Sequence, residues 1–305
     1  MNSRAVFLLV ALGCVSASAL AQSTIPTTIH YGSEPTSFGE LTVPSGDGPF
    51  PVVVLIHGGC WRSDRGSVGA FRPTAEALEG KGIATWNIEY RRVGHEGGGW
   101  PGTLLDLGEA VDFLPSLADS YSLDLERIVL LGHSSGGHFA AWLAVRPLLP
   151  QSSEIRGEPL IDIAGVVMAD AYIDPMVIDS TGVDGVLYCG EPLLERLIGG
   201  RPDTHPEQLR QISPIDWLPW GLRQEYIISS RRYPVTPPRP LADGRTTMRM
   251  LDYPELSRGT GDPINVEIIS DADHFDFTTP DTEAFEAVEL AVLRVLESRD
   301  WAVVD

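Results

Sequence analysis

The sequence predicts an α/β domain with a mostly parallel β-sheet covered by helices on both faces. Two observations favour this class. Short apolar segments alternate along the chain with longer amphipathic ones, and several of the short segments are continuously apolar and end in glycine. Continuously apolar strands are typical of a sheet buried on both faces. Strands that alternate with helices favour right-handed crossovers and parallel strand pairs.

Eight short segments are expected to form the strands of this sheet. The first two alternate apolar and polar residues, which predicts an antiparallel start, whereas the later ones have the continuous apolar pattern of buried strands. The eight segments are residues 27–32, 38–44, 51–59, 82–90, 127–135, 162–170, 224–230 and 264–270.

Helices are expected between these strands. They are residues 69–79, 103–118, 136–145 and 282–297. Two stretches rich in Pro, Gly and Asp, residues 175–220 and 236–263, interrupt the alternation after the sixth and seventh strands. We expect them to be loop insertions or a partial lid over the strand ends, where open α/β sheets bind ligands.

The N-terminal residues indicate export. Residues 1–21 combine one positive charge, an apolar run and the small-x-small site Ala19–Ala21, as a secretory signal peptide does. Residues 22–305 are then expected to form a single domain in the periplasm or outside the cell. Lipidation at Cys14 is the less favoured alternative, because Ala11 stands where a lipoprotein signal has Leu.

The charge balance limits the partners. With 42 acidic and 22 basic residues the formal net charge is −20, which disfavours binding to nucleic acid or to anionic lipid. After the signal peptide no run approaches the roughly 20 apolar residues that a membrane-spanning helix requires. A soluble protein with a small-molecule partner is expected, and its oligomeric state stays open.

Ser134 is the predicted nucleophile. It lies in the middle of Gly132–Gly137, which reads GHSSGG between a predicted strand and a predicted helix. A sharp strand-to-helix turn forces its central residue into a strained conformation, and the flanking glycines remove side chains that would clash there. The turn also brings the first N–H groups of the helix close to the serine hydroxyl.

A second glycine motif is the predicted oxyanion hole. His57–Trp61 reads HGGCW and follows a buried strand. The backbone N–H groups of Gly58 and Gly59, with Cys60 as a further candidate, are expected to act together with the N–H of Ser135. His57 is expected to hold this loop rather than to transfer protons.

His274 is the predicted general base. It lies in DADHFDF directly after the last predicted strand, and a histidine on that loop can reach a serine at the end of a central strand. The other histidines show no metal-ligand spacing with a Cys or a carboxylate, so a metal site is not expected. They are His30, His57, His95, His133, His138 and His205. Acyl transfer through a serine needs no cofactor, so none is expected either.

Several motifs together resemble the α/β-hydrolase superfamily. The chain is similar to the esterase branch with an HGG-x-W loop, which includes bacterial carboxylesterases, feruloyl-esterase-like proteins and kynurenine-formamidase-like enzymes. The resemblance implies the roles given above for Ser134, His274, Ser135 and the HGG loop. It is carried by LIHGGCWR, NIEYRRVG, GGGWPGTLLDL, GHSSGGHFAAWLAVRP, LIGG, ISPIDWLP and ISDADHFDFTTP.

The acid that orients the histidine departs from this pattern. Relatives carry an Asp on the loop after the seventh strand, but Ser229–Pro238 contains no carboxylate, and Tyr233 stands at the expected position. Asp170 ends the neighbouring sixth strand and is the predicted replacement, with Asp174 as the alternative. Other carboxylates, or no acid at all, stay open. The others are Asp243, Asp252, Asp271 and Asp273.

The resemblance implies a serine hydrolase that cleaves carboxylic esters through an acyl-enzyme on Ser134. Activated amides, as in arylformamidases, are an alternative substrate class. The alternative from a different class is a hydrolase fold with weakened catalysis that binds a ligand, with Arg231 and Arg232 forming an anion-binding corner. The sequence leaves open whether Cys60 and Cys189 form a disulfide.

Overall fold

An eight-stranded sheet runs through the protein in the order β1-β2-β4-β3-β5-β6-β7-β8. The computed structural model describes residues 25–158, 161–176, 189–232 and 252–297. All eight predicted strands are confirmed, and each of them is slightly shorter or shifted at its ends. The strands are β1 Thr27–His30, β2 Phe38–Thr42, β3 Phe50–Ile56, β4 Ala84–Ile88, β5 Leu123–His133, β6 Gly165–Ala169, β7 Arg223–Ser229 and β8 Ile264–Ile269.

The strand directions also follow the prediction. β1 pairs with β2 and β2 with β4 in antiparallel fashion, and every pair from β4 to β8 is parallel. Parallel strands end at the same edge of a sheet. The turns after β3, β5, β6, β7 and β8 therefore lie along one edge, and the candidate site residues are on these turns.

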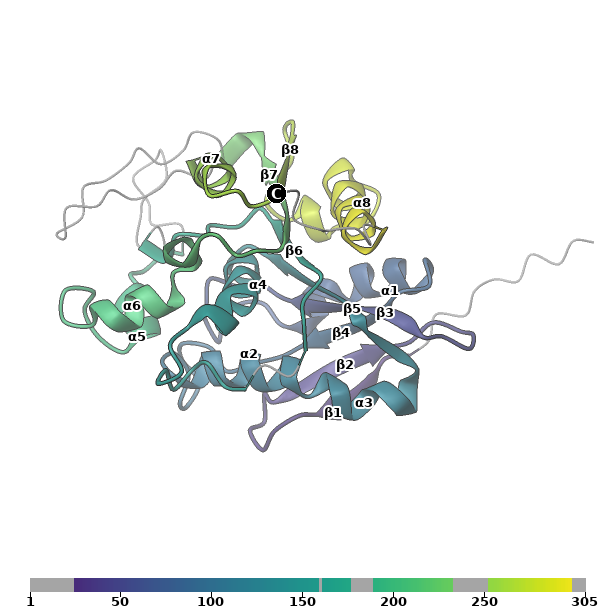
Figure 1. Cartoon of the computed structure of the whole chain (residues 1–305), viewed down its shortest axis with the longest axis horizontal. Helices are drawn as coiled ribbons and strands as arrows, with labels where there is room; N and C mark the ends of the chain where they lie inside the picture. The colour runs from purple at the N-terminus through teal and green to yellow at the C-terminus, as the bar shows by residue number, and fades with distance from the viewer. Residues whose placement is uncertain (1–24, 159–160, 177–188, 233–251, 298–305) are drawn as a thin grey trace, which may run out of the picture.

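Helices cover both faces of the sheet and form two cores. On β3, Val52, Val54 and Ile56 point into the core shared with α2, α3 and α4, whereas Val53 and Leu55 point into the core shared with α1 and α8. Figure 1 shows the two helical layers on opposite sides of the sheet. These helices are α1 Arg72–Glu79, α2 Gly102–Asp112, α3 Leu114–Tyr121, α4 Ser135–Val145 and α8 Glu283–Glu297.

The single helix predicted for residues 103–118 is wrong. The structure has two helices there, α2 and α3, which are separated at Phe113. Pro115 has no N–H to donate to the carbonyl of Val111, and its ring clashes with that carbonyl, so one continuous helix cannot pass through this position. The helix predicted for residues 69–79 also differs at its start, where Val68–Phe71 forms a 3₁₀ helix before α1 begins.

The two predicted insertions contain short helices in their described parts. The first insertion includes α5 Leu194–Ile198 and α6 Pro206–Ile212, and the second includes α7 Asp252–Gly259. Residues 177–188 and 236–251 lie outside the described residues, as does the predicted signal peptide. The function of the insertions stays a prediction.

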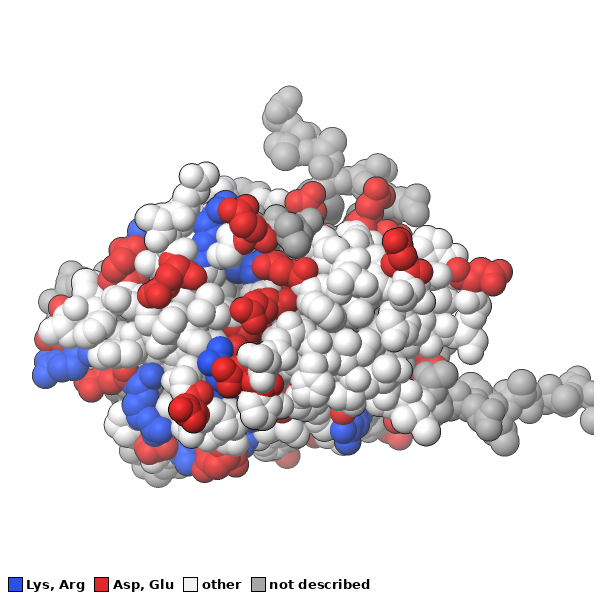
Figure 2. All heavy atoms as spheres, turned by 90° about the horizontal axis from the view of Figure 1, so that it is seen from below, with Lys and Arg blue, Asp and Glu red and all other residues white. Residues whose placement is uncertain are grey.

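Charged side chains are unevenly spread on the face seen in Figure 2. Asp and Glu mix with Lys and Arg on the left of the view, and a broad area without charged side chains lies on the right. The described part of this face presents no continuous basic patch. None of the helices in the described residues combines the length and the apolar composition needed to cross a membrane.

Candidate active site

Ser134 occupies the tight turn between β5 and α4. Its backbone has φ 57° and ψ −124°, a conformation that L-residues rarely adopt. The turn is possible because no side chain projects from Gly136, where a Cβ would lie 1.9 Å from the carbonyl oxygen of Ile56. The helix that begins at Ser135 then leaves the Ser134 hydroxyl at the edge of the sheet, as expected for a nucleophile turn.

His274 contacts the Ser134 hydroxyl. Its Nε2 lies 2.9 Å from Ser134 Oγ and its Nδ1 lies 2.5 Å from Asp170 Oδ2. An ionised carboxylate only accepts, so Nδ1 carries the proton and Nε2 accepts from the serine. The backbone carbonyl of His274 accepts a hydrogen bond from His133 Nε2 at 2.7 Å. The loop is thereby fixed to the residue that precedes the serine.

Asp170 is fully buried at the end of β6. Because β6 lies between β5 and β7, this position faces both the serine turn and the loop after β8. The Ser229 N–H donates to Asp170 Oδ1 at 3.2 Å, and the Asp170 N–H donates to the carbonyl of Ile227 at 2.7 Å. Asp170 has φ 43°, so the chain turns sharply here and directs the carboxylate toward the histidine.

The alternative acids occupy other positions. Asp174 is buried, and its Oδ1 accepts the N–H of Met176 at 2.9 Å, as in a turn that fixes the following loop. Asp273 pairs with Arg231 on the surface, so Arg231 does not offer the unpaired corner of the binding hypothesis. Further candidates are Asp271, whose N–H donates to Ser230 Oγ at 3.1 Å, and Asp252, which begins α7. Tyr233 and Asp243 lie outside the described residues.

The predicted oxyanion loop has an unusual backbone. Gly59, Cys60 and Trp61 have φ values of +127°, +55° and +58°. A Cβ on Gly59 would lie 2.2 Å from the carbonyl oxygen of Arg65, so only glycine fits there. The left-handed region costs an L-residue roughly 1–2 kcal/mol. Cys60 and Trp61 therefore need contacts that hold them in this conformation.

A buried ionic cluster supports the start of this loop. His57 Nδ1 lies 2.7 Å from the Gly58 carbonyl oxygen, and its Nε2 lies 3.0 Å from Glu89 Oε1. Arg92 pairs with the same Glu89 oxygen at 2.9 Å. Burial raises the pKa of Glu89, but the hydrogen bond from His57 and the charges of His57 and Arg92 outweigh it, so this pKa lies below its ordinary value.

Trp61 is held by a neutral histidine. Its indole N–H donates to His138 Nδ1 at 3.3 Å, and His138 Nε2 donates to the carbonyl of Ile212 at 2.8 Å. Complete burial lowers the pKa of His138 from 6.5 to about 4, although the hydrogen bond to Ile212 opposes this. Uncharged His138 thus connects the oxyanion loop, α4 and the insertion after β6.

A pocket of about 470 Å³ opens above the serine. Ser134 and His274 lie on its wall beside the three predicted oxyanion donors, Gly58, Gly59 and Ser135. The rest of the lining is mostly apolar or aromatic. It comprises Cys60, Trp61, Arg65, Gly66, Ala70, His133, Tyr172, Cys189, Phe275 and Thr278. Among the described residues, no group of three or more His, Cys, Asp or Glu side chains could hold a metal ion.

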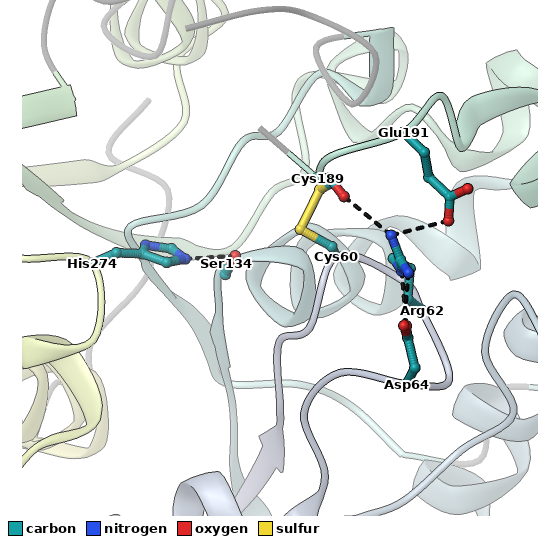
Figure 3. Close-up of a disulfide and its surroundings, with 7 residues drawn as sticks. All are labelled: Cys60, Arg62, Asp64, Ser134, Cys189, Glu191 and His274. Atoms are coloured by element: carbon teal, nitrogen blue, oxygen red, sulfur yellow. Dashed lines mark hydrogen bonds and ion pairs between the residues drawn. A yellow bond between two sulfur atoms is a disulfide. The ribbon is translucent and has the colours of Figure 1, made fainter. Parts of the chain in front are cut away.

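Cys60 and Cys189 form a disulfide, which answers the question that the sequence left open. Their Cα atoms are 5.6 Å apart, and 129 positions of sequence separate them. The bond joins the oxyanion loop to the segment before α5 and lies beside Ser134 in the pocket wall (Figure 3).

Comparison with protein families assigns this chain to one of them. The model of the BD-FAE family matches residues 41–228, a span that contains the HGG loop, Ser134 and Asp170. The chain belongs to the BD-FAE family. His274 follows the matched span, so its place beside Ser134 comes from the structure.

Curated proteins with related sequences are named as esterases. Esterase LipC of Mycobacterium tuberculosis is 26% identical over 175 residues, which cover 55% of this chain and 40% of LipC. A probable isoprenylcysteine alpha-carbonyl methylesterase of Arabidopsis thaliana is 29% identical over 128 residues, or 42% of this chain and 26% of that protein. This BD-FAE chain therefore spans less than half the length of these two relatives.

Two solved structures with the same fold are named as esterases. Esterase 2 of Thermogutta terrifontis superposes with a TM-score of 0.65 at 18% identity and covers 89% of this chain and 92% of its own. Esterase B of Lactobacillus rhamnosis superposes with a TM-score of 0.68 at 16% identity, and the match covers 88% of this chain and 85% of esterase B. These similarities establish the α/β-hydrolase fold of this BD-FAE member, as the sequence predicts.

The neutral state of His138 makes stability depend on pH. Between pH 6.5 and 4 the unfolded chain binds a proton at this histidine that the folded protein does not, so the free energy of unfolding falls as the pH drops through this window. In His138→Gln the new side chain keeps a donor and an acceptor but does not titrate. Between pH 7 and 4.5 we expect the free energy of unfolding of this variant to fall by about 2–3 kcal/mol less than that of the wild type.

Urea unfolding at the two pH values measures this difference. The control is His205→Gln, which removes a histidine that contacts Thr204 and so tests whether the loss of any histidine gives the same result. Equal pH dependence in the wild type and the His138→Gln variant would show that His138 is not neutral in the folded protein.

Proposed function

We propose that this protein is a serine carboxylesterase. The observation that carries the proposal is the continuous hydrogen-bond chain from Ser134 Oγ through His274 to Asp170, with distances of 2.9 and 2.5 Å, at the wall of a pocket. Ser134 is the nucleophile, His274 the general base and Asp170 the acid that orients it. The names of the related proteins, esterases among them, support an ester as the substrate.

Acylation begins with attack of Ser134 Oγ on the ester carbonyl. His274 Nε2 takes the hydroxyl proton while the new C–O bond forms and the carbonyl electrons move to its oxygen. The N–H groups of Gly58, Gly59 and Ser135 stabilise that oxyanion. When the intermediate collapses, the proton on Nε2 passes to the leaving alcohol oxygen, and the acyl group stays on Ser134.

Deacylation repeats these steps with water. His274 Nε2 removes a proton from the water that attacks the acyl carbonyl, a second oxyanion forms in the same hole, and the proton returns to Ser134 Oγ as the carboxylic acid leaves. Throughout the cycle, Asp170 keeps Nδ1 protonated and stabilises the imidazolium that forms twice. No step requires a cofactor.

The geometry favours the enzyme over the ligand-binding alternative. In a binding protein without the acid, the His274 ring would have no carboxylate partner, whereas here Asp170 accepts from its Nδ1. Activated amides remain a second substrate class, because the same acyl transfer applies to them and only the leaving group differs. A structural relative, esterase 2 of Thermogutta terrifontis, has been solved in a form phosphoramylated by tabun, which supports the use of organophosphorus probes here.

The mutational test compares three variants in turnover of 4-nitrophenyl acetate and in labelling by a fluorophosphonate. Ser134→Ala should abolish labelling. Asp170→Asn keeps the shape of the buried side chain but loses the charge, and we expect turnover to fall by about 10⁴-fold, as when the acid of a serine triad is removed. Asp174→Asn is the matched control and should stay within a few-fold of the wild type.

Each alternative has its own outcome. A large loss in Asp174→Asn with little change in Asp170→Asn would move the acid to Asp174. Labelling of the folded wild type no faster than that of Ser134→Ala would contradict the esterase and favour a binding protein.

We further propose that the protein is exported and that residues 1–21 are removed. The charged start, the apolar run and the Ala19–Ala21 site support this. Expression of the full chain in a bacterium with a periplasm should give a periplasmic protein whose first residue is Gln22, as measured by N-terminal sequencing. Retention of Met1 in a cytoplasmic protein would contradict export, and a lipid on Cys14 would contradict cleavage at Ala21.

A further inference from the structure

The oxyanion loop is attached to the insertion after β6 at two points. The first is the Cys60–Cys189 disulfide. The second is Arg62, two residues after Cys60, whose Nη1 donates to the Cys189 carbonyl at 3.3 Å and pairs with Glu191 Oε1 at 3.0 Å. In Figure 3 the disulfide and the guanidinium of Arg62 lie side by side against the same segment.

Arg62 is itself held in place on its other side. Its Nε and Nη2 donate to the two carboxylate oxygens of Asp64 at 2.8 and 2.7 Å, and its backbone N–H donates to the Gly59 carbonyl at 3.0 Å. A bidentate pair of this kind fixes the direction of the guanidinium as well as its distance. Arg62 therefore transmits the position of the 189–191 segment to the turn that contains Gly59.

These attachments act on the strained part of the loop. Cys60 and Trp61 both have positive φ values, 55° and 58°, and relaxation of either residue to negative φ would rotate the adjoining peptide groups. Those peptide groups adjoin the Gly58 and Gly59 N–H donors. A donor that is moved or rotated no longer points at the oxygen that becomes negative in the transition state.

We propose that the disulfide and Arg62 form a clamp that positions the oxyanion donors, so that full activity requires the oxidised protein. The proposal rests on the esterase function given above. Cys60, Cys189 and Arg62 are positioning residues, since they act through the loop and not on the reacting atoms. Loss of one oxyanion donor lowers turnover by 10²–10³-fold in a serine hydrolase, and a misplaced donor should cost about 10- to 100-fold.

The experiment measures kcat and KM for 4-nitrophenyl acetate and the inhibition constant of a trifluoromethyl ketone, which forms an oxyanion on the serine. In Cys60→Ser/Cys189→Ser we expect kcat to fall by about 10- to 100-fold with little change in KM, and the inhibition constant to rise by a similar factor. If the disulfide served stability alone, its loss would lower the melting temperature and leave kcat and the inhibition constant unchanged at 25 °C.

Arg62→Gln has a matched control in the same chain. Arg201 and Asp203 repeat the spacing and the bidentate geometry of Arg62 and Asp64, with distances of 3.0 and 2.9 Å, but lie outside the pocket lining. Arg62→Gln should lower kcat, and Arg201→Gln should not. If the double cysteine variant does not fold, reduction of the folded wild type, with circular dichroism as the check on folding, gives the same comparison.

The outcomes separate the clamp from the proposed function. An active wild type whose kcat is unchanged within two-fold by reduction, by the cysteine changes and by Arg62→Gln overturns the clamp alone. An oxidised, folded wild type that neither hydrolyses the ester nor binds the ketone overturns the esterase, and the clamp with it.

A separate observation concerns Arg65, the one Lys or Arg side chain in the described pocket lining. The nearby carboxylates already have partners, since Asp64 pairs with Arg62, and Glu191 pairs with both Arg62 and Arg196. Arg65 forms no ion pair with any residue that the structure describes. Its Nη2 lies beside Gly190 at the rim of the pocket, 3.6 Å from where a Cβ would be.

We infer that Arg65 recognises an anionic group on the substrate, a carboxylate that the ester carries in addition to its scissile bond. A protein with a net charge of −20 repels anions at long range. Arg65, which has no ion-pair partner among the described residues, can therefore favour an anionic ester only through a local contact. Arg65 is exposed, and an ion pair with an exposed arginine corresponds to about 2- to 5-fold in kcat/KM.

Two esters of matched size test this inference, the mono-4-nitrophenyl ester of glutaric acid and 4-nitrophenyl valerate. Arg65→Gln should lower kcat/KM for the anionic ester by about 2- to 5-fold and leave the neutral ester unchanged. Arg201→Gln again serves as the control and should change neither value. An equal effect of Arg65→Gln on both esters, or no effect on either, would overturn the anion site and leave the esterase intact.

Discussion

The rest of the site depends on the buried carboxylate of Asp170. A fully buried charge without partners would cost several kcal/mol, so the surrounding groups have to satisfy it. The Ser229 N–H supplies one hydrogen bond from the end of β7, and His274 Nδ1 supplies another from the loop after β8. One side chain thus fixes how β6, β7 and the histidine loop meet, and this arrangement in turn sets the distance from His274 to Ser134.

The position of this acid on β6 has a further effect on the neighbouring strand end. The end of β7 and the turn after it, residues 229–232, contain no carboxylate and make other contacts. Ser229 Oγ donates to the carbonyl of Ala272 at 2.5 Å, and Arg231 pairs with Asp273. The Ser229 hydroxyl and the Arg231 guanidinium therefore hold the histidine loop, while β6 provides the buried charge.

Much of the fold and part of the site follow from local sequence. The buried strands, the glycines around Ser134 and the order of serine and histidine have local causes, and Asp170 followed from the order of the strands in the sheet. The break at Phe113 was also visible, since Pro115 forbids a continuous helix there. The pairing of Cys60 with Cys189 and the attachment of Arg62 to Glu191 join residues about 130 positions apart, and no local pattern encodes such contacts. His57 and Glu89 are 32 positions apart, so no local pattern predicts the His57–Glu89–Arg92 cluster either, although the EYRR motif contains Glu89 and Arg92.

The disulfide divides the chain into a covalent ring and two open ends. The ring, residues 60–189, contains both Ser134 and Asp170, whereas His274 lies on the C-terminal part outside it. In the chain-entropy model, closing a ring of this size removes about 5 kcal/mol of freedom from the unfolded state. If β7, β8 and α8 detach, the proposed nucleophile and acid remain on the ring, whereas the proposed base leaves with the detached elements. Under the proposed function, hydrolysis requires the last quarter of the chain to be docked, and it can stop while most of the ring is still folded.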